Sequence, residues 1–413
     1  MRAILTLILL VLLHANGLAQ QENPHEFASQ GIIDTSLNKL EIYGGQDKLD
    51  SIFAQLSSLA LRGEGRINIL HLGDSHIQAD YFSGRMRDRF SKFVTGGEAS
   101  RGFIFPYAMA GSNNPANYRV WYSGKWTACR NIQRKKDCNL GLAGASVKTL
   151  TPNARMTVTQ PGGEHTIYGF DRVKVFHTFA PSSFSIHLLN NVAVLSSTDY
   201  PEAGYTEFLL DKRQDSLLLE FAQDNTSQTF FELHGISLET SEYGITYSAT
   251  GINGADVPAW LSCPQLGAQI ASLDLDLIII SLGTNDGYNT NFNEARFYAK
   301  FDTLLMRIED AAPQALIVLT TPGDNYFHKT QQNENTVKTE YLLRDLAKKH
   351  SCIVWDFYSA MGGANSIVLW QNNGLSVNDR VHLTKKGYLL QGDMLFSAII
   401  KEFDAYFERT VSY

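Results

Sequence analysis

The feature that most constrains the fold is an alternation of buried strands and amphipathic helices, which occurs in two separate blocks. The first block is the apolar run at residues 67–72, which ends at Gly73 and is followed by apolar side chains at helical spacing. The second block repeats the alternation, with strands expected at 275–282, 315–321 and 352–357, and helices at 294–311, 335–350 and 385–407. Apolar strands that alternate with helices predict a parallel sheet covered on both faces.

The chain between the two blocks has a different residue pattern. Residues 118–242 contain short segments in which apolar and polar residues alternate, and turns rich in proline and glycine separate them. Many short strands with frequent turns predict a β-sandwich or a jelly roll. We therefore expect a β-rich domain inserted into an α/β domain made of residues 66–117 and 243–413. Residues 20–65 are expected to form a helical lead-in, with apolar side chains on one helix face.

The first 19 residues have the pattern of a secretory signal peptide. Arg2 provides a positive start, residues 3–13 form a short apolar core, and Gly17-Leu18-Ala19 supplies small residues for cleavage. The core is too short for a stable membrane anchor, and no later segment is long and apolar enough to cross a bilayer. We expect export to the periplasm or to the extracellular space.

The net charge and the aromatic content limit the classes of molecule that the protein could bind. The net charge of −7 argues against a general nucleic-acid-binding protein. One basic cluster stands out, and we interpret it as a solvated loop: Arg130, Arg134, Lys135 and Lys136. The large aromatic side chains could contact a carbohydrate, but we expect those of Trp121, Trp126 and Tyr168 to lie in the hydrophobic core.

The chain has four cysteines. Export permits a disulfide between Cys129 and Cys138, which flank a short polar loop. Cys352 lies in an apolar, strand-like segment and is expected to be a buried thiol, whereas Cys263 could be free or paired. Because no cysteine has metal-ligand spacing, we expect no metal, and the chemistry below needs no organic cofactor.

Three segments at expected strand ends carry residues suited to acyl transfer. Ser75, in Gly73-Asp74-Ser75-His76, lies where a strand ends and a helix begins, so free N–H groups can face a developing oxyanion. Gly254 lies in the turn 251–256, where glycine lets the backbone point an N–H group at a ligand. Asn285 follows the most hydrophobic strand and can donate a hydrogen bond from its amide. Each of them, taken alone, is an ordinary turn residue.

A fourth segment supplies a base and its partner. His382 precedes the last helix, and Asp379 lies three residues before it. A histidine can take the serine proton and return it to the leaving group, while an aspartate fixes the tautomer of the imidazole. The four segments together provide a nucleophile, oxyanion donors, a base and an orienting acid, which is the set that acyl transfer needs.

These segments resemble the four signature blocks of the SGNH, or GDSL-type, hydrolase superfamily. The resemblance covers residues 66–117 and 243–410 and implies a three-layer α/β/α fold. It also implies a catalytic triad of Ser75, Asp379 and His382, with Ser75, Gly254 and Asn285 forming the oxyanion hole. Two features depart from the common pattern: the long interval between Ser75 and Gly254, and His76 where a leucine is usual.

Gly-Asp-Ser-His, the inserted β-rich domain and the Gly-Ile-Asn-Gly-Ala turn together resemble bacterial peptidoglycan O-acetylesterases. This narrower resemblance implies an acetylated cell-wall glycan as substrate and an acetyl-enzyme intermediate. Three alternatives stay open: an acetyl esterase for plant or capsular polysaccharide, a lipase or phospholipase, and an inactive glycan-binding protein. The absence of a long apolar lid-like segment disfavours the lipase, and the intact set of five site residues disfavours the inactive protein.

Overall fold

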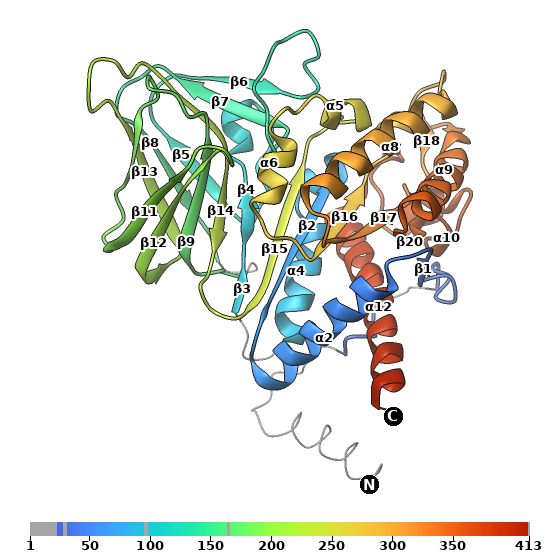
Figure 1. Ribbon diagram of the computed structural model, residues 1–413. Coiled ribbons are helices and arrows are strands. Elements are labelled where there is room, and N and C mark those ends of the chain that lie inside the picture. Colours follow the sequence, from blue (N-terminus) through green and yellow to red (C-terminus); the bar gives the residue numbers. More distant parts are fainter. Residues whose placement is uncertain (1–22, 28–30, 95–97, 163–165, 412–413) are drawn as a thin grey trace.

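The computed structural model describes residues 23–27, 31–94, 98–162 and 166–411. The expected signal peptide, residues 1–19, lies outside this part of the chain. Figure 1 shows two units side by side, a β-sandwich at the left and an α/β unit at the right.

The α/β unit is built on a sheet of seven strands. Their order is β1 (Leu40–Ile42), β20 (Ile353–Trp355), β17 (Leu316–Thr320), β16 (Leu277–Ser281), β2 (Arg66–Gly73), β15 (Gly244–Gly251) and β3 (Glu98–Ser100). All neighbours are parallel except β1, which pairs antiparallel with β20 at one edge. The parallel α/β sheet predicted from the sequence is therefore confirmed, with one antiparallel edge strand contributed by the lead-in.

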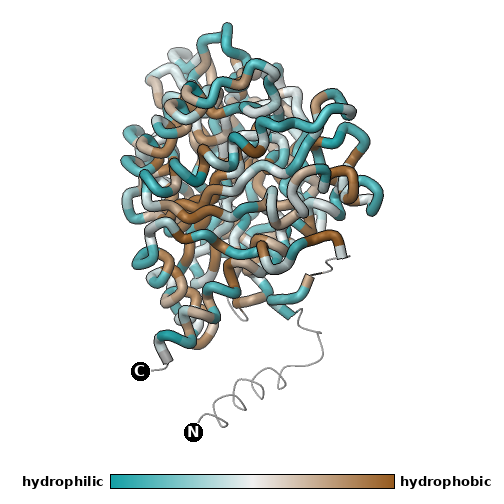
Figure 2. Tube along the Cα trace, turned by 90° about the vertical axis from the view of Figure 1, so that its right-hand side faces the viewer, coloured by the Kyte–Doolittle hydropathy of each residue, from teal (hydrophilic) through white to brown (hydrophobic). Residues whose placement is uncertain are grey.

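Helices cover both faces of this sheet. One face packs against α2 (Gln46–Arg62), α4 (Phe82–Phe93) and α12 (Lys385–Val411), and the other against α5 (Val257–Leu261), α6 (Leu266–Ala271), α8 (Glu294–Ala311) and α9 (Asn335–His350). Side chains of β2 alternate between the two cores: Ile67 and Ile69 enter the α4 side, whereas Leu70 and Leu72 enter the α8 side. Figure 2 shows hydrophobic segments gathered in a band within the molecule, with many hydrophilic segments on its outside.

The inserted unit consists of two antiparallel sheets. The larger has the order β11 (Val194–Tyr200), β12 (Tyr205–Gln214), β9 (Phe170–His177), β14 (Phe231–Glu239), β7 (Ala145–Thr149) and β6 (Trp126–Arg130), with β4 (Gly102–Ile104) also paired to β14. The smaller has the order β10 (Ser185–Leu188), β13 (Ser216–Ala222), β8 (Ala154–Thr159) and β5 (Arg119–Tyr122). Phe221 of the smaller sheet packs against Trp126 and Phe231 of the larger. The expected sandwich is thus present, and its larger sheet also uses β4, which precedes residue 118.

The cysteine and aromatic predictions have mixed outcomes. Cys129 and Cys138 form a disulfide, as predicted, and Cys352 is a buried free thiol, as is Cys263. Tyr168 is buried as expected. The expectation of a core position is wrong for Trp121, which is 53% exposed because side chains alternate along β5: Val120 packs against the core, and Trp121 faces the opposite side of the sheet.

No described helix combines the length and the apolar character that crossing a membrane would require. No group of three or more histidine, cysteine or acidic residues is placed to hold a metal ion in the described part of the chain.

The apolar pattern after β2 forms two helices, α3 (Ser75–Gln78) and α4, rather than one. Asp80 separates them with a φ of 52°, a left-handed conformation that aspartate adopts more readily than most residues. Its buried carboxylate accepts hydrogen bonds from Arg87 Nη1 (3.0 Å), Arg101 Nη2 (2.8 Å) and Asn117 Nδ2 (2.6 Å). Burial alone would raise the pKa of Asp80, but the two guanidinium groups outweigh it and hold the pKa well below its ordinary value. This network fixes the chain directly behind the Ser75 turn.

We predict that Asp80→Ala lowers the free energy of unfolding by about 3–5 kcal/mol, because it leaves two buried guanidinium groups without their counter-ion. The exposed pair of Asp345 and Lys348 offers a matched control, since Asp345→Ala should cost at most about 1 kcal/mol. Urea unfolding of both variants measures the difference. Equal, small losses would show that the buried network does not carry the stability assigned to it.

Candidate functional site

The site lies where three neighbouring strands end. β2 runs between β15 and β16, and Gly73 at its end is level with Gly251 on one side and Ser281 on the other. The chain visits β15 and then β16 on opposite sides of β2, so the ends of these strands form a topological switch point, where open α/β sheets bind ligands. Ser75, Gly254 and Asn285 each follow one of these three strands.

Ser75 is the first residue of α3, and its Oγ lies 2.9 Å from His382 Nε2. The Nδ1 atom of His382 lies 2.8 Å from Asp379 Oδ2. A carboxylate at Nδ1 keeps the proton on that nitrogen, so Nε2 is left as the acceptor for the Ser75 hydroxyl. The structure therefore connects all three residues of the expected triad, although His382 is 307 positions from Ser75.

The carboxylate of Asp379 is held by the loop that carries His382. Its Oδ1 accepts hydrogen bonds from the backbone N–H groups of Val381 (2.8 Å) and His382 (2.9 Å). Partial burial would raise the pKa of Asp379, but these hydrogen bonds and the one to the His382 ring outweigh it and lower the pKa below its ordinary value. The aspartate thus stays ionised beside the imidazole over the whole neutral range.

The turn after β15 brings a backbone N–H group to the site. Gly254 has a φ of 81°, a left-handed conformation suited to glycine, and no atom of the described chain accepts a hydrogen bond from its N–H group. Gly251, at the end of β15, is needed for a different reason. A Cβ atom there would lie 2.4 Å from the carbonyl oxygen of Asp74, so glycine lets this turn pack directly against the Ser75 turn.

Asn285 lies in α7 (Thr284–Gly287), directly after the β16 end. Its Nδ2 atom donates to Asp74 Oδ2 (3.1 Å) and to the backbone oxygen of Ala255 (2.9 Å). These two bonds orient the amide between the Ser75 turn and the Gly254 turn. They also engage both amide hydrogens, so donation to a substrate oxygen requires that one of the two bonds be exchanged.

Two buried carboxyl groups lie beside this amide. Burial raises the pKa of Asp74 to about 7, although the backbone N–H of His76 and the Asn285 amide favour its ionised form. Asp286, whose two oxygens face the backbone N–H of Val257 at 3.1 and 3.2 Å, also has a pKa raised to about 7 by burial and then by Asp256. Both carboxyl groups therefore change charge near neutral pH.

The pKa of Asp286 is higher in the folded chain, at about 7, than in the unfolded chain, at about 4. Its contribution to the free energy of unfolding is therefore fully present below about pH 4 and declines as the pH rises toward 7. We predict that Asp286→Asn removes part of this decline. The variant should gain about 1–3 kcal/mol relative to the wild type at pH 8, and less at pH 4. Urea unfolding at both pH values measures it. The same gain at pH 4 and pH 8 would contradict a raised pKa at Asp286.

His76 lies behind the pair formed by Ser75 and His382. Its ring stacks on that of His382, with centroids 5.2 Å apart and an interplanar angle of 24°. The Tyr388 hydroxyl lies 2.9 Å from His76 Nδ1, and burial lowers the pKa of His76 to about 3. His76 is therefore an uncharged ring that supports the face of His382, and it does not itself belong to the triad.

The structure also assigns neighbours that the sequence did not identify. Asp74 holds the Asn285 amide, and Tyr388 holds His76. Asp74 lies inside the recognised motif, so its type was visible, but its partner comes from a segment 211 positions away. Tyr388 lies in the apolar pattern of the last helix, where nothing distinguishes it from a core residue.

Comparison with known proteins agrees with this geometry. Residues 231–390 match the GDSL-like Lipase/Acylhydrolase family, a range that contains Gly254, Asn285, Asp379 and His382. This part of the chain is therefore similar to GDSL-like acylhydrolases, and the match supports the esterase activity that the sequence predicted. The family match begins in β14, so Ser75 lies before it in sequence and joins it only in space.

The fold is shared with a solved peptidoglycan O-acetylesterase. That structure aligns with a TM-score of 0.72 over 89% of this chain and 99% of its own, at 23% sequence identity. The acetyl xylan esterase AlAXEase aligns over 38% of this chain and 81% of its own, with 19% identity and a TM-score of 0.30. Axe2, an acetylxylan esterase from Geobacillus stearothermophilus, aligns over 39% and 73%, with 16% identity and a TM-score of 0.31. No curated protein matches the sequence.

Proposed function

We propose that the protein is an exported serine esterase that removes O-acetyl groups from a bacterial cell-wall glycan. The observation that carries this proposal is the connected chain from Ser75 Oγ through His382 to Asp379, at 2.9 and 2.8 Å, beside the Gly254 and Asn285 turns. The fold shared with a peptidoglycan O-acetylesterase supports the substrate class, because the alignment covers 89% of this chain and so extends into the β-sandwich. The signal-like residues 1–19 and the Cys129–Cys138 disulfide support export.

The reaction would run in two steps. Ser75 Oγ attacks the acetyl carbonyl carbon while His382 Nε2 takes the hydroxyl proton, and the tetrahedral oxyanion accepts hydrogen bonds from the N–H groups of Ser75 and Gly254 and from Asn285. The C–O bond to the sugar then breaks, and the sugar oxygen leaves with the proton from His382. Water attacks the acetyl-enzyme, again gives a proton to His382, and acetate leaves as Ser75 recovers its hydrogen.

Ser75→Ala should reduce kcat for a small acetyl ester at least about 10⁴-fold, because the acyl-enzyme can no longer form. Thermal unfolding should be nearly unchanged, since in the described structure the Ser75 hydroxyl forms a side-chain hydrogen bond only with His382. Acetate release from p-nitrophenyl acetate and from O-acetylated peptidoglycan measures the loss. Wild-type activity in this variant would rule out Ser75 as the nucleophile.

Asn285→Ala should keep measurable activity, with kcat about 10²–10³-fold lower, because one oxyanion donor is lost while the triad remains. The exposed Asn373, whose amide donates only to the nearby Leu369 carbonyl, provides the control variant Asn373→Ala. Steady-state kinetics on p-nitrophenyl acetate separates the two. A loss confined to KM would mean that Asn285 binds substrate without stabilising the transition state.

A further inference from the structure

A pocket of about 150 Å³ adjoins the candidate active site on the Asn285 side. Asn285 itself lines it, together with residues from the start of α8 and from the loop between β6 and β7. We call it the α8 pocket. Its size suits one small polar group and is well below that of a pocket for a drug-sized ligand.

The rim of the α8 pocket carries three basic side chains: Arg134, Arg296 and Lys300. Arg296 and Lys300 are exposed and lie four residues apart on α8, so they face the same side of the helix. Neither makes an ion pair with any residue that the structure describes. The N-terminal end of α8, with its partial positive charge, opens toward the same space.

The acidic groups of the pocket are already engaged. Asp256 forms an ion pair with Arg134 and accepts a hydrogen bond from the backbone N–H of Ala259 (3.0 Å). Asp286 faces the backbone N–H of Val257 with both oxygens. The positive charges of Arg296 and Lys300 are therefore the ones left to meet a ligand.

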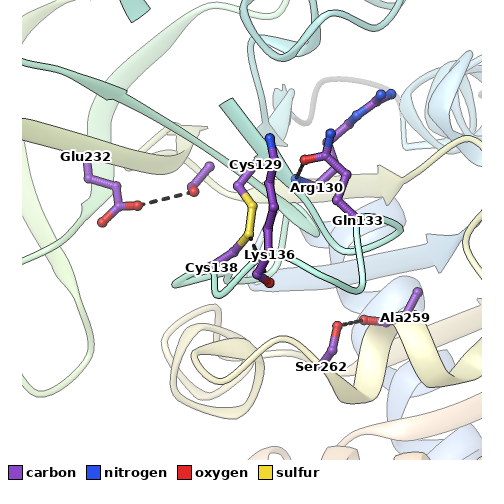
Figure 3. Close-up of a disulfide and its surroundings, with 9 residues drawn as sticks. Cys129, Arg130, Gln133, Lys136, Cys138, Glu232, Ala259 and Ser262 are labelled. Atoms are coloured by element: carbon purple, nitrogen blue, oxygen red, sulfur yellow. Dashed lines mark hydrogen bonds between the residues drawn. A yellow bond between two sulfur atoms is a disulfide. The ribbon is translucent and has the colours of Figure 1, made fainter. Parts of the chain in front are cut away.

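One wall of the α8 pocket comes from the inserted domain. Arg134 lies in the loop closed by the Cys129–Cys138 disulfide, and Figure 3 shows this loop above α5, which carries Ala259. The ion pair between Arg134 and Asp256 attaches the loop to the turn that contains Gly254. The β-sandwich thus contributes to the wall of the pocket next to the oxyanion turn.

We propose that the α8 pocket is a subsite for a carboxylate of the acetylated glycan, carried by an acidic sugar or by a peptide attached to the sugar. This proposal rests on the proposed function and deepens it by naming the charge of the substrate. The whole chain carries a net charge of −7 and disfavours an anionic substrate in general, so a local cationic pocket beside the reacting ester supplies the attraction. A neutral acetylated glycan gains nothing from it.

The test compares four acetyl esters. An O-acetylated muropeptide carries carboxylates on its peptide, acetylated oligogalacturonate carries them on its sugars, and acetylated xylo-oligosaccharide and p-nitrophenyl acetate are neutral. The variants are Arg296→Gln, Lys300→Gln and the double substitution. Lys348→Gln, which removes an exposed lysine of α9 outside the pocket, is the matched control for net charge.

We expect the double variant to raise the ratio of KM for anionic to KM for neutral substrate about 3- to 10-fold, with each single variant in between. Lys348→Gln should leave that ratio unchanged. High salt should raise the same ratio in the wild type and have less effect in the double variant, because salt screens exposed charges.

The possible results distinguish failure of the proposed carboxylate subsite from failure of the proposed function. A response to muropeptide alone assigns the carboxylate to the peptide, and a response to oligogalacturonate assigns it to the sugar. Cleavage and response confined to oligogalacturonate would overturn the cell-wall substrate and leave the subsite standing. An unchanged ratio in the double variant overturns the subsite, whichever glycan is cleaved. Cleavage of neutral esters alone overturns both.

Discussion

The site depends on the register of β2 between β15 and β16. Because Gly73 is level with both Gly251 and Ser281, three chain segments leave the sheet at the same edge and within contact of one another. The close approach at Gly251 and the Asp74–Asn285 hydrogen bond then fix the turns relative to each other. A shift of one residue in either pairing would reverse which face each side chain occupies and separate these groups.

Much of this arrangement could be predicted from local pattern. The bounds of α8 and α9 agree with the expected ranges because both helices carry a clear apolar stripe, and Asn293 caps α8 through the N–H of Arg296. The apolar strands could be predicted equally well from their sequence pattern. β1 could not be predicted, because three residues carry too little periodicity to distinguish an edge strand from a loop.

Other features depend on contacts between distant segments, which no local pattern reveals. The break at Asp80 follows from a buried carboxylate that meets two arginines, one of them from beyond α4. The candidate site residues could be named from their motifs, and the geometry that links them is consistent with that choice. Their surroundings could not be named, since the partners of Asp74 and His76 lie hundreds of positions away.

The position of the sandwich within the chain has a consequence for how the enzyme matures. β2 is synthesised first, but its two neighbours in the sheet follow only after the whole β-sandwich, and His71 of β2 meets Tyr247 and Ser281 across 176 and 210 positions. Contacts of such long range form late in folding. His382 comes immediately before the final helix, so the Ser75–His382 contact requires nearly the entire chain. On the proposed mechanism, a chain that is still being synthesised lacks its base, so ester hydrolysis at Ser75 waits until the last helix has docked.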